Sequence, residues 1–140
     1  MSTPDVAANK AATIERCVKR AREVYAANIE NLTDDSLKQD SIVLNLQRAC
    51  EAAIDLAMHL VRVRRLGIPQ ESRQAFDMLA DAGVLPAPLA RTLKAMVGFR
   101  NIAVHDYRKI DLDIVRTILE RHLDDLLAFA GIALKTSADG

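Results

Sequence analysis

Apolar residues recur every three or four positions along most of this chain, which is the spacing of an amphipathic α-helix. The pattern predicts long helices over about residues 3–29, 36–66 and 112–134 and a short one over about 72–82. A further helix is predicted to begin near Pro86 and to weaken around 105–107. Strict alternation is scarce, so no strand is expected. The fold class predicted is all-α: an antiparallel four-helix bundle with one short extra helix.

Length and composition indicate a single domain. The 140 residues, half of them apolar, suffice for one hydrophobic core. We expect that domain to span residues 1–134, with a frayed polar tail over 135–140. No apolar run approaches the roughly 20 residues that cross a bilayer, and the first ten residues lack the pattern of a signal peptide. A cytoplasmic protein without membrane contact follows, with Cys17 and Cys50 as free thiols on apolar stripes.

Charge is balanced overall but uneven along the chain. Nineteen Lys and Arg offset 19 Asp and Glu, which argues against a generally basic coat for nucleic acid. Residues 59–110 still hold nine basic and four acidic side chains, so phosphate contacts are expected there. At the end of the second long helix there is an alternative that needs no ligand, because cations near a helix C-terminus interact favourably with the helix dipole. The candidate phosphate contacts are Arg62, Arg64, Arg65, Arg108 and Lys109.

One segment gathers side chains that carry chemistry, in the spacing Arg-x4-His-x-Tyr: Arg100, Asn101, His105 and Tyr107. On an ideal helix Arg100 and Tyr107 lie about 20° apart, whereas Arg100 and His105 lie about 140° apart. One straight helix therefore does not aim Arg100 and His105 at one atom. Either the helix bends near Val104, or two copies of the motif meet across a dimer axis. An alternative needs no function: Arg and His side chains near a helix C-terminus interact favourably with the helix dipole.

Other polar residues suggest structure rather than chemistry. Asp55 and His59 stand four residues apart and are predicted to form a buried structural pair, and His122 is predicted to be a surface or boundary residue. The chain contains no Glu-x-x-His pair and no Gly-rich phosphate loop. Neither a metal nor a cofactor is therefore expected.

The run from Arg100 to Tyr107 resembles the signature of HEPN-domain proteins, specifically the HepT toxins, in which Asn or Asp usually follows the Arg. The second long helix is similar to theirs as well, through the run from Asp40 to Ala49 followed by Ile54, Asp55 and His59. The resemblance covers roughly residues 8–133. It implies an HEPN-like bundle, a homodimer whose motifs meet in an interfacial cleft, and a metal-independent endoribonuclease.

The resemblance also implies a role for each motif residue. Arg100 and His105 would be the catalytic pair, Asn101 would support them, and Tyr107 would be adenylylated by an MNT-like nucleotidyltransferase antitoxin of a type VII-like toxin–antitoxin pair. The residue types suit RNA cleavage through the 2′-OH, because His exchanges protons near neutral pH and Arg binds phosphate. Two alternatives stay open: a non-catalytic HEPN module that binds a nucleotide or a nucleotidyltransferase, and a purely structural helical adaptor.

Overall fold

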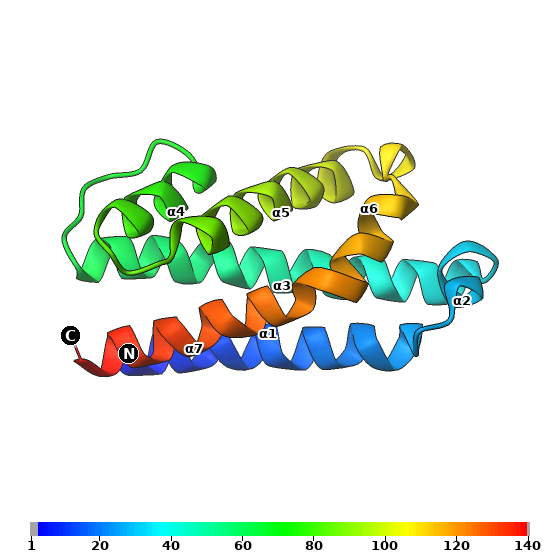
Figure 1. The fold of residues 1–140 in the computed structure, drawn as a ribbon, viewed down its shortest axis with the longest axis horizontal. Coiled ribbons are helices and arrows are strands. Elements are labelled where there is room, and N and C mark those ends of the chain that lie inside the picture. Colours follow the sequence, from blue (N-terminus) through cyan, green and yellow to red (C-terminus); the bar gives the residue numbers. More distant parts are fainter. Residues whose placement is uncertain (1–2, 140) are drawn as a thin grey trace.

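The computed structural model describes residues 3–139, and over this range the chain contains helices and turns but no strand. α3 (Ser36–Val63) lies at the centre of the bundle. α1 (Thr3–Tyr25) runs antiparallel to it on one side, and α4 (Ser72–Asp81) and α5 (Ala87–His105) lie on the other side (Figure 1). The last helix packs against α1, α3 and α5. The predicted all-α bundle with one short extra helix is confirmed.

A continuous apolar core holds the helices together. The periodic apolar residues of α1 and α3 are buried, with Ile14, Leu46 and Leu56 fully inaccessible. Phe76 of α4 and Phe129 of the last helix meet edge to face, with ring centroids 5.6 Å apart. Because each helix turns one apolar stripe inward, the polar faces remain available for other contacts.

The connection after α1 differs from the prediction. α1 ends at Tyr25, because Ala26 and Ala27 adopt positive φ angles of 47° and 56°. A short helix, α2 (Ile29–Thr33), follows, and the Asn28 side chain caps it by accepting a hydrogen bond from the Glu30 amide. The apolar stripe continues across this turn, so spacing alone predicted one helix as far as residue 29.

The last helix is longer and less regular than predicted. It comprises α6 (Leu112–Thr117), a π-helical turn (Ile118–His122) and α7 (Leu123–Asp139). The expected frayed tail over 135–140 is wrong for residues 135–139, which are helical, and Gly140 lies outside the described residues. The helix continues because Ala133 and Ser137, one turn apart, both face the bundle and are buried.

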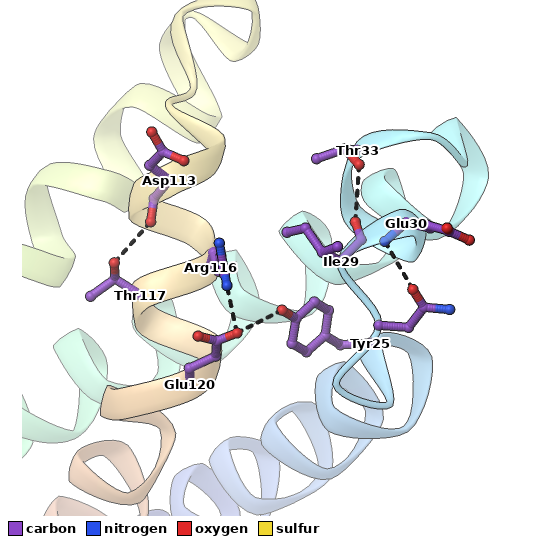
Figure 2. Close-up of polar contacts among 9 residues, drawn as sticks. Tyr25, Ile29, Glu30, Thr33, Asp113, Arg116, Thr117 and Glu120 are labelled. Atoms are coloured by element: carbon purple, nitrogen blue, oxygen red, sulfur yellow. Dashed lines mark hydrogen bonds and ion pairs between the residues drawn. The ribbon is translucent and has the colours of Figure 1, made fainter.

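Polar contacts join the end of α1 to the last helix. The Tyr25 hydroxyl donates to Glu120 Oε2 at 2.9 Å, and Arg116 Nε lies 3.2 Å from the same oxygen (Figure 2). Arg22 Nη2 reaches Asp124 Oδ1 at 2.7 Å. These contacts fix the register of the last helix against α1.

The remaining global predictions concern cysteines and membranes. Cys17 and Cys50 are free and buried, and burial raises the pKa of the Cys50 thiol to about 12. Among the described residues, no helix has the length and hydropathy that would let it cross a bilayer.

Candidate functional site

The motif lies where α5 ends. Arg100, Asn101 and His105 belong to the last two turns of α5, and Tyr107 begins a 3₁₀ turn (Tyr107–Lys109). The helix stops because Asp106 leaves the helical region, with φ −153° and ψ 74°. α5 stays α-helical through Val104, so Arg100 and His105 keep their separation of about 140° around the axis. Arg100 is half-buried toward α3, whereas His105 is exposed.

Arg100 is held by neighbours on α5 and α3. Its Nη1 donates to Asn101 Oδ1 at 3.0 Å, and its Nε lies 4.0 Å from Glu51 Oε1. Gln47 Nε2 donates to the same Glu51 oxygen at 2.8 Å and thereby orients the carboxylate. The Nε of Arg100 is buried and has no hydrogen-bond partner among residues 3–139. A charged donor without an acceptor is suited to receive an anionic oxygen.

Tyr107 reaches a different part of α3. Its hydroxyl donates to Asp40 Oδ1 at 2.5 Å, while 41% of the residue is exposed. Burial, the hydrogen bond and the negative charge of Asp40 together raise the pKa of Tyr107 to about 12. The expectation that Tyr107 shares the Arg100 face of one helix is wrong, because α5 ends two residues before it.

One face of α3 nevertheless serves both motif residues. Asp40 and Glu51 are 11 positions apart, which places them within about 20° of each other around the helix axis. The sequence reasoning assigned no role to Asp40, Gln47 or Glu51. Their spacing of seven and four residues on one helix face was the available signal, but nothing local to α3 indicates which helix lies opposite.

Several predicted side-chain pairings are replaced by others. Asn101, expected to support Arg100 and His105, accepts a hydrogen bond from Arg100, because the two side chains adjoin at the half-buried face of α5. Asp55 pairs with Lys10 of α1 at 3.0 Å rather than with His59, because its exposed side chain points away from the core that buries His59. His122 is half-buried, as expected for a surface or boundary residue, and its Nδ1 contacts Asp125 at 2.8 Å.

The predicted phosphate contacts separate into two groups. Arg108 and Lys109 are exposed in the turn that holds Tyr107, and Lys109 pairs loosely with Asp106 at 3.5 Å. Arg62, Arg64 and Arg65 lie at the far end of α3, 11 or more residues and about 16 Å or more along the axis from Glu51. They lie away from the motif, because α5 runs antiparallel to α3 and its motif end lies toward the other terminus of α3 (Figure 1).

An apolar groove of about 660 Å³ opens between α5 and α6 next to the motif. It is lined on α5 by positions 95, 98 and 102, which continue at helical spacing to His105. Ile102 and Ile114 at its edges are 42% and 48% exposed, so the groove has an apolar rim open to a partner. Within residues 3–139, no group of three or more His, Cys, Asp and Glu side chains is placed to hold a metal ion.

Comparison with known proteins agrees with the motif and the fold. The chain is 49% identical over 128 residues to the mRNA nuclease HepT of Shewanella oneidensis, covering 91% of this chain and 96% of that protein. It is 29% identical over 118 residues to a putative RNase of Archaeoglobus fulgidus, covering 77% and 89% of the two chains.

Solved structures of toxin–antitoxin complexes are also similar to this chain. The tri-AMPylated HEPN toxin of Shewanella oneidensis, in complex with its MNT antitoxin, superposes with a TM-score of 0.86 at 48% identity, over 91% of this chain and 96% of the toxin. A toxin–antitoxin complex with AMP-PNP gives the same TM-score at 47% identity, over 92% and 98%. The sequence model of the ribonuclease HepT-like family matches residues 14–131. The chain belongs to the ribonuclease HepT-like family.

Proposed function

We propose that this protein is the toxin of a type VII-like toxin–antitoxin pair and that it is a metal-independent endoribonuclease. The observation that carries the proposal is the complete Arg-x4-His-x-Tyr motif at the end of α5, in which Arg100 holds a buried donor without an acceptor. The Shewanella oneidensis relative that is 49% identical to this chain is an mRNA nuclease. The half-buried, charged Arg100 is suited to bind a phosphate of RNA and to stabilise the charge that builds on it.

His105 supplies the proton transfers. Cleavage without a metal uses the ribose 2′-OH as nucleophile, so one group must accept its proton and another must protonate the departing 5′ oxygen. An imidazole does both near neutral pH, and the exposed His105 is open to a substrate. The expected products are a 2′,3′-cyclic phosphate and a 5′-hydroxyl. Asn101 supports the reaction by fixing the Arg100 guanidinium rather than His105.

The protein works as a homodimer. In one copy Arg100 turns toward α3 while His105 points to solvent, so the two side chains do not converge. A second copy that brings its own motif to this surface completes the site. The exposed apolar edge formed by Ile102 and Ile114 lies beside His105 and would be buried in such a dimer. Arg108 and Lys109, exposed in the adjoining turn, then contact neighbouring phosphates.

Tyr107 is the target of an MNT-like nucleotidyltransferase antitoxin. A structural neighbour is a tri-AMPylated HEPN toxin bound to such an antitoxin, and the ring of Tyr107 is exposed enough for modification. An added nucleotide monophosphate would extend over the face of α3 that also carries Glu51 and faces Arg100. Its bulk and negative charge would then block and repel RNA. Both RNA and ATP are available in the cytoplasm, where we place the protein.

Expression without a partner tests this proposal. We expect the wild-type chain to arrest bacterial growth, and Arg100→Ala or His105→Ala to restore growth at equal protein levels. Sedimentation should give a dimer for all three, because neither side chain is part of the apolar edge. Arrest that persists in both variants would contradict the nuclease and favour a module that binds a nucleotide or the transferase. A monomeric wild type would contradict the shared site.

A further inference from the structure

A second groove, of about 620 Å³, runs between α1 and α3 and has an opposite character to the apolar one. Charged and polar side chains from both helices line it. Four of them are cations, namely Lys10, Arg16, Arg20 and Arg48, and two are acids, Glu51 and Asp55. The cations of α1 extend over ten residues, or about 15 Å along the helix.

Two of these cations have no counter-charge. Lys10 is neutralised by Asp55 at 3.0 Å, and Arg20 lies 3.7 Å from Glu23. Arg16 and Arg48 form no ion pair and no hydrogen bond with any residue in the part of the chain that the structure describes. Both guanidinium groups are exposed, so both remain available to a ligand.

Arg16 and Arg48 line the same groove, although they belong to different helices. Cys17, which is 4% exposed, lines the groove with them, and the charges of both Arg16 and Arg48 act to lower the pKa of its thiol, against the larger effect of burial. Two unpaired guanidinium groups in one groove repel each other, and an anion bound between them relieves that repulsion. A phosphodiester is the anion that guanidinium groups bind best, through paired hydrogen bonds.

The groove leads to the motif. Glu51 lines it and is also the carboxylate 4.0 Å from Arg100 Nε. A chain of phosphates lying along α1 and α3 therefore reaches Arg100 past two acidic side chains that already have partners: Asp55 pairs with Lys10, and Glu51 contacts Gln47 and Arg100. We propose that this groove binds the sugar–phosphate backbone of the RNA substrate, with Arg16 and Arg48 as its phosphate contacts, and leads the strand to Arg100. This inference rests on the proposed ribonuclease function.

Binding of a fluorescent single-stranded RNA, followed by anisotropy, tests the groove. All proteins carry His105→Ala so that the RNA stays intact. The double variant Arg16→Gln/Arg48→Gln should bind about tenfold more weakly at low salt, and the slope of log Kd against log salt should fall by about 1.4, because two phosphate contacts are lost. The matched control is Arg64→Gln/Arg65→Gln, which removes the same charge from the far end of α3 and should change Kd less than threefold.

Three results would overturn the proposal: equal losses in both double variants, no RNA binding by the His105→Ala chain, or loss of antitoxin capture with unchanged RNA binding in the groove variant. Thermal melting followed by circular dichroism checks that the variants fold, and the single substitution Arg48→Gln replaces the double one where it does not. Cleavage by the wild-type chain together with unchanged binding by the groove variant would contradict the groove while leaving the ribonuclease intact.

Discussion

The two tyrosines of this chain make the same contact in opposite settings. Tyr25 is buried at the end of α1, and its hydroxyl donates to Glu120 at 2.9 Å (Figure 2). Tyr107 is 41% exposed, and its hydroxyl donates to Asp40 at 2.5 Å. Glu120 is balanced by Arg116 at 3.2 Å, whereas no cation in the described part of the chain forms an ion pair with Asp40.

The difference shows that a tyrosine–carboxylate hydrogen bond does not by itself define a role. Around Tyr25, burial of the ring and the cation on its acceptor make the contact part of the joint between α1 and the last helix. Around Tyr107, the ring is open to a partner, and the hydrogen bond only sets its direction. We therefore assign stability to Tyr25, whereas Tyr107 stays the proposed site of modification.

The largest expected effect separates the two residues in the reaction with the antitoxin. Tyr107→Phe removes the oxygen that would be adenylylated, so the mass gain per chain should fall to zero while RNA cleavage continues. Tyr25→Phe should be modified as fully as the wild type. Mass spectrometry of the intact chain after incubation with the antitoxin and ATP measures both. A Tyr107→Phe chain that still gains AMP would remove Tyr107 from the mechanism.

The effect on the free energy of unfolding should be larger for Tyr25 than for Tyr107. Tyr25→Ala leaves a cavity under the joint and should lower the free energy of unfolding by about 3 kcal/mol. Tyr107→Ala, at an exposed turn, should lower it by less than about 1 kcal/mol. Urea denaturation followed by circular dichroism gives both values. Similar losses in the two variants would mean that the turn after α5 is as tightly packed as the joint.

The acceptor should control the acidity of Tyr107. Asp40→Asn keeps an oxygen that accepts the hydrogen bond but removes the negative charge, so the pKa of Tyr107 should fall from about 12 toward its ordinary value of 10. Titration of phenolate absorbance in a Tyr25→Phe background observes Tyr107 alone. Burial is the first cause of the raised pKa for both tyrosines, so part of the shift should remain in Asp40→Asn. An unchanged pKa in Asp40→Asn would mean that burial alone sets it.

The smallest effect is a dependence of stability on alkaline pH. A group whose pKa is raised in the folded state stabilises that state fully below its unfolded pKa and loses this contribution as pH rises through the folded pKa. For Tyr107 the window runs from about 10 to about 12. The stability advantage of the wild type over Tyr107→Phe should therefore shrink across this range. A constant difference between the two denaturation curves would contradict the contact with Asp40 in solution.

Much of the fold followed from the sequence because the core dictates it. Periodic apolar residues, such as Ile14 on α1 and Leu46 on α3, predict the helices, since each helix must bury one face. The helix ends were less predictable, since Ala26 and Ala27 are strong helix formers that nevertheless take left-handed angles at a turn. The helical tail likewise depends on Ser137 being buried against the bundle, which its polarity does not indicate.

The candidate site was likewise predictable only in part. The spacing on α5 singled out Arg100 and His105 as candidates, and their angular separation left a bent helix or a second copy as the ways to bring them together. The partner of Tyr107, however, lies 67 residues earlier, and no local pattern connects the two. Segment charges gave no indication of the groove between α1 and α3: residues 1–58 hold seven basic and nine acidic side chains, yet packing of α1 on α3 places Arg16 and Arg48 in one groove.

Cleavage of RNA in excess chelator tests the central claim most directly. Wild type and His105→Ala would be expressed without any antitoxin, and intact mass would establish that Tyr107 is unmodified in both. We predict that the wild type cuts RNA and leaves 2′,3′-cyclic phosphate ends, while His105→Ala binds the same RNA without cutting it. An unmodified wild-type dimer that cuts no RNA, or a His105→Ala chain that cuts as fast as the wild type, would contradict the proposed mechanism.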